Sequence, residues 1–148
     1  MLSRAEATEQ VLEAKQAKGM SFEELAGHVG RHEVWVASAV LGQATMSAEE
    51  AERVTDVLGL EPEVAAALAR IPSRGAFDGA VPVDPLLYRF FEIIQVFGPA
   101  IQAVIHEKFG DGIMSAIDFE LDIQRKPDPK GDRVLLTMDG KFLGYRPW

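Results

Sequence analysis

The feature that most constrains the fold is a long apolar stretch from Pro85 to Ile105, in which only Arg89 and Glu92 are charged. Residues three apart lie on one face of a helix, so these two charges are expected to be neighbours. A charged side chain in apolar surroundings is costly unless it is paired or binds a ligand. The stretch therefore predicts a helix that needs a partner surface. Its charged pair is either a structural salt bridge at a subunit contact or part of an anion site.

The anion-site interpretation depends on three side chains. Arg89 offers a planar set of donors that suits carboxylate-like anions, and Glu92 would hold that group in place or handle a proton. Ser115 adds a hydroxyl just after the turn Gly110-Asp111-Gly112, where free backbone N–H groups favour anions. A serine-hydrolase mechanism would lack its base, because no His or Lys is fixed next to Ser115 by spacing. Ser115 is predicted to act as a hydrogen-bond donor.

Composition narrows the class of protein. The 148 residues suit one domain, or a small module plus a second unit, and 47% hydrophobic with 26% charged residues is ordinary for a globular chain. The two charges in the longest apolar stretch argue against a membrane span. The absence of cysteine excludes disulfides, thiolate nucleophiles and cysteine-ligated zinc. With no apolar leader segment at the start, we expect a cytoplasmic protein.

The first half of the chain predicts short helices. Serine followed three residues later by glutamate, the spacing of a capping box, occurs three times, at Ser3, Ser21 and Ser47. Together with glycine stops, the pattern predicts helices at 3–18, 21–30, 33–41, 47–59 and 61–70.

Short helices joined by glycine-containing turns are typical of a helix-turn-helix, with 31–41 as the recognition helix. That would make the chain a transcription regulator with a C-terminal oligomerisation domain. However, residues 1–73 carry a net charge of −6, and 31–41 has little with which to contact bases or phosphates. A helical bundle used for packing or assembly is the favoured interpretation, and no nucleic-acid partner is expected.

The second half is predicted to begin after a linker. Residues 71–84 hold two prolines and two glycines, which gives a division into domains 1–73 and 74–148. Asp84 is expected to cap a helix to Val96, and Gly98-Pro99 to kink or break it before a second helix ending near Phe109.

The remaining residues are expected to form a short helical or irregular piece and then strands. The helical or irregular piece is expected at 113–117. Strands are expected at 118–125, 133–138 and 141–145, the last two joined by a turn at Asp139-Gly140. Three short strands are weak alone, so pairing with another subunit would complete the sheet.

His28 and His32 are four residues apart, a spacing that metal-ligand pairs use. No acidic partner is fixed by the spacing, and a glycine lies between them, so two ordinary histidines are expected. The chain contains none of the GxGxxG, P-loop or GxSxG motifs. No metal or nucleotide cofactor is therefore expected.

Several long motifs resemble those of the cyanase family (cyanate hydratase, also called cyanate lyase). They are YRFFEIIQVFG, HEKFGDGIMSAIDFELDI and LTMDGKFL, together with LGQ at 41–43 and IPSRG at 71–75. The resemblance covers nearly the whole chain and is strongest from Pro82 to Ile123. It implies an enzyme that converts cyanate and bicarbonate to carbamate and carbon dioxide, after which carbamate gives ammonia and a second carbon dioxide. The loop before Asp84 lacks a cysteine found in some relatives, which puts thiol sensitivity in doubt rather than catalysis.

The resemblance also implies an architecture and a site. The expected fold is α+β: an N-terminal helical bundle like a repressor DNA-binding domain that does not bind DNA, and a C-terminal unit of helices and a small β-sheet intertwined in a dimer. Five such dimers would form a homodecamer with active sites between subunits and no cofactor. Arg89, Glu92 and Ser115 match the catalytic residues of the family. A non-catalytic assembly protein, in which Arg89 and Glu92 are only structural, remains the further alternative.

Overall fold

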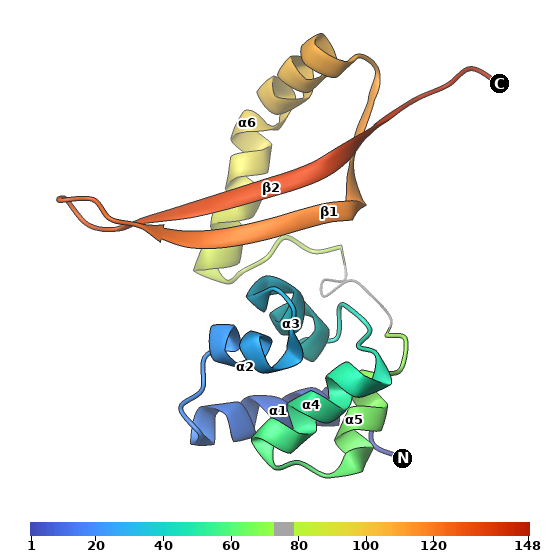
Figure 1. Ribbon diagram of the computed structural model, residues 1–148. Coiled ribbons are helices and arrows are strands. Elements are labelled where there is room, and N and C mark those ends of the chain that lie inside the picture. Colours follow the sequence, from blue (N-terminus) through green and yellow to red (C-terminus); the bar gives the residue numbers. More distant parts are fainter. Residues whose placement is uncertain (73–78) are drawn as a thin grey trace. The chain divides into compact units, whose positions relative to one another are not determined.

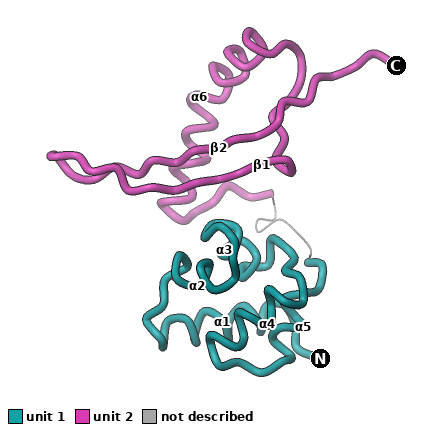
Figure 2. Tube along the Cα trace, viewed as in Figure 1, with its two compact units in different colours: residues 1–76 teal, residues 77–148 magenta. Residues whose placement is uncertain are grey.

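The computed structural model describes residues 1–72 and 79–148, which belong to two compact units, 1–76 and 77–148 (Figures 1 and 2). Six helices and one two-stranded antiparallel sheet are present in the described residues. The α+β fold class predicted from the sequence is thus confirmed. The proposed division between residues 73 and 74 lies outside the described residues. No helix in the described ranges is long and apolar enough to cross a membrane.

The first unit is a bundle of five short helices. They are α1 (Arg4–Ala17), α2 (Phe22–Val29), α3 (Glu33–Val40), α4 (Ala48–Leu58) and α5 (Pro62–Leu68). Complete capping boxes at Ser3, Ser21 and Ser47 begin α1, α2 and α4, as the serine–glutamate spacing predicted. Gly30 and Gly59 end α2 and α4 in the left-handed conformation that glycine adopts without steric cost.

The hydrophobic core of the described residues lies entirely in this first unit. Its largest fully buried side chains come from all five helices and the loop before α4: Val11, Leu25, Val29, Val36, Val40, Met46, Val54, Val64 and Leu68. Arg4 links several helices of the bundle by hydrogen bonds. Its guanidinium donates to the carbonyls of Ala39, Ala44 and Ala67 at 2.6–2.9 Å. These bonds join the start of α1 to the ends of α3 and α5.

Glu50 of α4 is a buried carboxylate that accepts hydrogen bonds from Ser47 and Arg31. Its burial opposes ionisation, but hydrogen bonds from the Ser47 backbone N–H (2.8 Å) and the Arg31 guanidinium (2.5 Å) outweigh that and hold the pKa of Glu50 below its ordinary 4.5. A lowered pKa in the folded state stabilises the fold above pH 4.5, and this contribution is lost as pH falls through the folded-state pKa.

We therefore expect the free energy of unfolding of the wild type to decrease as the pH is lowered below about 4.5. In Glu50→Gln the free energy of unfolding should depend less on pH. The free energy of unfolding of Glu50→Gln at pH 7 should be lower than that of the wild type by on the order of 1 kcal/mol. Urea unfolding of the full chain from pH 3 to 7 measures both, with Glu9→Gln on an exposed position of α1 as the control. Equal pH dependence in wild type and Glu50→Gln would contradict this prediction.

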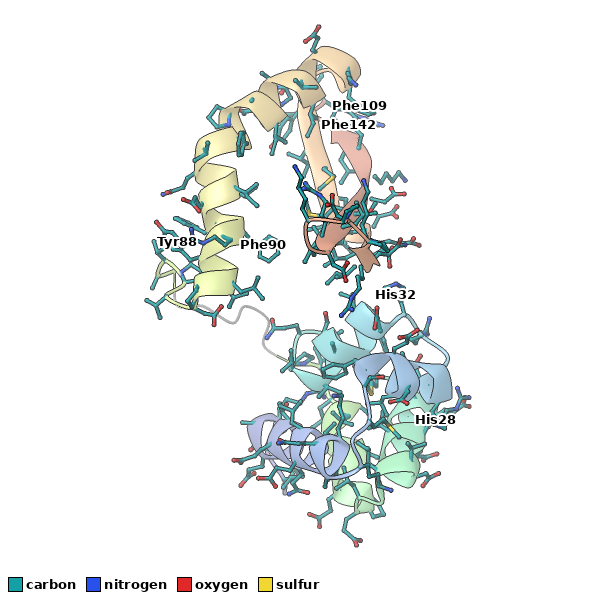
Figure 3. All side chains as sticks on the ribbon, turned by 90° about the vertical axis from the view of Figure 1, so that its left-hand side faces the viewer. His28, His32, Tyr88, Phe90, Phe109 and Phe142 are labelled. Carbon is teal, nitrogen blue, oxygen red and sulfur yellow. The ribbon has the colours of Figure 1, made fainter. Side chains whose placement is uncertain are left out.

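The second unit begins with one long helix, α6 (Pro85–Phe109). Asp84 caps it as predicted, its side chain accepting from the N–H groups of Leu86 and Leu87 at 2.9 and 3.0 Å. The predicted break into two helices at Gly98-Pro99 is wrong, since Pro99 lies inside the helix. Proline removes one backbone hydrogen bond and bends a helix, and Figure 3 shows α6 changing direction along its length.

The rest of the unit is a single hairpin of β1 (Gly112–Lys126) and β2 (Arg133–Gly144). Of the short helical or irregular piece expected at 113–117, the helix is wrong, because those residues belong to β1, whose pairing is irregular between Met114 and Phe119. The turn expected at Asp139-Gly140 and the separate third strand are also wrong, since β2 passes straight through them. Phe109 stacks on Phe142 with ring centres 5.3 Å apart, which joins the end of α6 to β2 (Figure 3).

No residue of α6 is buried within one chain. Large apolar side chains along the whole helix are at least two-fifths exposed: Leu86, Leu87, Phe90, Ile93, Ile94, Val96, Phe97, Ile101, Val104 and Phe109. Many large exposed apolar side chains on one helix are typical of a protein–protein interface. Within the described residues, this apolar surface of α6 stays exposed.

Candidate functional site

Arg89 and Glu92 form an ion pair near the start of α6. Arg89 Nη1 lies 2.9 Å from Glu92 Oε2, and Arg89 Nε donates to the carbonyl of Pro85 at 3.3 Å. The guanidinium carbon also lies 5.1 Å from the centre of the Tyr88 ring. Figure 3 shows Tyr88 and Phe90 leaving α6 on different sides. The spacing of three residues thus brought the pair together, whereas the contribution of Tyr88 was not foreseen.

The charged pair is exposed in the single chain. The side chains of Arg89 and Glu92 are 59% and 45% exposed, and an ion pair so placed stabilises a fold by about 0–1 kcal/mol. Arg89 Nη2 makes no hydrogen bond to the described part of the chain, so this face of the guanidinium can still receive an anion. The pair is held in a defined geometry without contributing much to the stability of one chain.

Ser115 lies on β1 and is almost completely buried. Its Oγ accepts hydrogen bonds from the backbone N–H groups of Ile117 and Asp118, both at 3.0 Å. A hydroxyl has two accepting positions and one proton to donate. Because both accepting positions of Ser115 Oγ are occupied, the hydroxyl can form a further hydrogen bond only by donating its proton. No ionisable side chain is hydrogen-bonded to Ser115 in residues 1–72 and 79–148.

A bulge in β1 of the hairpin begins at Ser115. Met114 pairs with Phe142, but the next paired residue of β1 is Phe119, opposite Gly140. Residues 115–118 of β1 therefore face Lys141 alone, and Lys141 Nζ lies 3.9 Å from Asp118 Oδ2 across the bulge. Bulges often occur beside active sites, where they re-aim a side chain.

The predicted site has two parts in this structure, the Arg89–Glu92 pair on α6 and Ser115 on β1. Within the described residues, no hydrogen bond or ion pair connects Ser115 to Arg89 or Glu92. Sequence spacing could place Arg89 beside Glu92, but it contained no information on the distance from either to Ser115.

The histidines of the first unit have local roles. His32 caps α3, its Nδ1 accepting from the N–H of Val34 at 3.2 Å. His28 lies near the end of α2. No group of three His, Cys, Asp or Glu side chains suited to a metal ion occurs in the part of the chain that the structure describes.

Two family models match the chain over nearly its whole length. "Cyanate hydratase, N-terminal" matches residues 4–72, and "Cyanate lyase C-terminal domain" matches residues 79–147. The cyanate hydratase of Acaryochloris marina is 56% identical over 144 residues, which cover 97% of this chain and 98% of that protein. The cyanate hydratase of Synechococcus sp. strain CC9311 is 55% identical, with 95% and 94% coverage.

A solved structure shares the fold. The crystal structure of cyanase from T. urticae superimposes with a TM-score of 0.84 at 40% sequence identity, over 94% of this chain and 97% of that one.

Proposed function

The chain belongs to the cyanate hydratase (cyanate lyase) family, and on this premise we propose that it catalyses the bicarbonate-dependent decomposition of cyanate. Cyanate, bicarbonate and one proton give carbamate and carbon dioxide. Carbamate then takes up a second proton and gives ammonia and another carbon dioxide. The comparisons lend no support to the transcription-regulator alternative.

The mechanism is supported by two separate features: Arg89, ion-paired with Glu92 on α6, and Ser115 on β1, whose hydroxyl oxygen already accepts two backbone N–H groups. Both substrates are small monoanions, so binding them side by side requires donors that offset their mutual repulsion. Arg89 presents its unpaired donors to one anion, and Ser115 donates its hydroxyl proton. Charge is dispersed onto these donors as a bicarbonate oxygen attacks the cyanate carbon.

Glu92 is assigned to orient Arg89, with proton relay as its second possible role. Its 2.9 Å contact with Nη1, together with the Pro85 carbonyl and the Tyr88 ring, limits the guanidinium to a narrow range of orientations. The proposal includes no metal or cofactor, because the cyanate carbon is already electrophilic.

We assign a homodecamer built from five intertwined dimers, with sites between subunits. This is supported by the uncovered apolar surface of α6 and by the separation of Ser115 from the Arg89–Glu92 pair on different elements. The first unit would serve packing in this assembly as a repressor-like bundle without DNA binding. The proposed location is the cytoplasm.

Ammonia release from the purified protein tests the function. Cyanate is supplied in carbonate-free buffer, with and without added bicarbonate. Ammonia that appears only with bicarbonate, together with twice as much carbon dioxide, is the expected result. A folded oligomer that releases no ammonia under either condition would overturn the enzyme assignment and favour the non-catalytic assembly protein.

The apolar surface of α6 gives a separate prediction for assembly. Ile94→Asp places an unpaired charge where an interface is expected, which is strongly unfavourable on burial. Light scattering should show a decamer of the 16.2 kDa chain for wild type and a much smaller species for Ile94→Asp. Ile94→Leu, which keeps the site apolar, serves as control. A decamer in Ile94→Asp would show that this part of α6 is not an interface.

A further inference from the structure

The bulge that carries Ser115 depends on what lies opposite it on β2. Ser115 itself stabilises the bulge by accepting from Ile117 and Asp118, and the pairing resumes with Phe119 opposite Gly140. The backbone of β2 must therefore pass close to the first peptide unit of the bulge. The position of Ser115 depends on how close that approach is.

Gly140 makes the close approach possible. A Cβ atom at Gly140 would lie 2.5 Å from the backbone oxygen of Ser115 and 2.6 Å from Cγ of Met114. Gly140 is not among the glycines with positive φ, so a left-handed backbone does not account for glycine here. Only the missing side chain explains glycine at this position. The methionine could turn aside, but the Ser115 carbonyl is part of the bulge backbone and could move only with it.

We propose that Gly140 is a positioning residue that sets the place of the Ser115 hydroxyl for the reaction. This inference rests on the proposed function. Ordinary van der Waals contact would require the Ser115 peptide to move by about 1 Å, and a misplacement of that size can lower a rate about 100-fold. Gly140 touches no substrate in this scheme and acts only through Ser115.

Gly140→Ala is the direct test, with Gly144→Ala as its matched control. Gly144 lies on the same strand, but a Cβ there would meet its nearest neighbours at 3.7 Å, an ordinary contact distance. We expect kcat for bicarbonate-dependent ammonia release to fall about 10- to 100-fold in Gly140→Ala and to stay near wild type in Gly144→Ala. Wild-type kcat in Gly140→Ala would overturn the proposal.

A double-mutant cycle separates positioning from general damage. If Gly140 acts through Ser115, Gly140→Ala should cause little further loss of kcat in a Ser115→Ala background. A merely structural role would lower the rate by the same factor in both backgrounds, and that outcome would overturn the proposal. The proposal would also be overturned if Gly140→Ala failed to fold while Gly144→Ala folded, because Gly140 would then be needed for folding rather than for positioning Ser115.

Hydrogen exchange tests the geometry independently of catalysis. The amides of Ile117 and Asp118 are bound by Ser115 Oγ, so the segment 115–119 should be protected in wild type and in Gly144→Ala. Faster exchange of this segment in Gly140→Ala alone is expected, whether or not cyanate is the substrate. Unchanged exchange would contradict the proposal. A wild type without bicarbonate-dependent turnover would instead overturn the proposed function, and with it the catalytic part of the inference.

Discussion

Replacing Arg89 by lysine is expected to lower kcat for cyanate decomposition by about 10²- to 10³-fold. Lysine keeps the positive charge but not the planar set of donors. In the structure that planar group contacts Glu92 through Nη1 and Pro85 through Nε at the same time. An ammonium group has three N–H donors on a single nitrogen, which cannot occupy the positions of both Nη1 and Nε. The loss should therefore come from geometry rather than from charge.

Steady-state ammonia release by Arg89→Lys measures this effect, with light scattering to show that assembly is unchanged. Arg125→Lys is the matched control, because Arg125 is a surface residue of β1 paired with Asp132 at 3.5 Å and should tolerate the same change. Full activity in Arg89→Lys would remove Arg89 from the site. A loss of activity together with loss of the oligomer would instead favour a structural salt bridge at a subunit contact.

Replacing Ser115 by alanine is the second change with a large expected effect, a fall in kcat of about 100-fold or more with measurable activity left. The variant loses the donated hydrogen bond and also leaves the N–H groups of Ile117 and Asp118 without their acceptor. Residual activity is expected because Arg89 and Glu92 would still bind and orient the anions. Ser38→Ala is the control, since that hydroxyl donates to the carbonyl of Val34 within α3 at 2.8 Å.

The same variant distinguishes a donor from a nucleophile. A nucleophilic serine would form a covalent carbamoyl intermediate, and its replacement by alanine would abolish turnover. Mass spectrometry of wild type quenched during turnover would detect such an adduct on the peptide containing Ser115. We expect no adduct, because Ser115 Oγ accepts two backbone N–H groups and is assigned the role of a donor. Detection of the adduct would change the role of Ser115 from donor to nucleophile.

Local signals in the sequence predicted the helices well. The serine–glutamate spacings located the starts of α1, α2 and α4, and Asp84 located the start of α6, because a cap is formed by residues two or three apart. The ion pair of Arg89 and Glu92 was predictable for the same reason. Pro99 was misread because a proline that would end an isolated helix is tolerated within a long one.

Long-range contacts explain the failures in the hairpin. Gly140 follows an aspartate, which is typical of a turn, yet glycine is required there by the approach of Ser115 from 25 positions earlier in the chain. The bulge at 115–118 also breaks the alternation of apolar and polar residues, so the start of β1 did not look like a strand. The relation of Ser115 to Arg89 could not be predicted from spacing, because the proposed site needs more than one chain.

The uneven distribution of the core between the two units has a consequence for folding kinetics. The first unit contains its own core, so its refolding should follow a rate that is independent of protein concentration. No residue of α6 is buried in the described part of the chain, so in the proposed oligomer the second unit should order in a slower phase whose rate rises with concentration. Between the two phases the chain would be half folded and prone to aggregate.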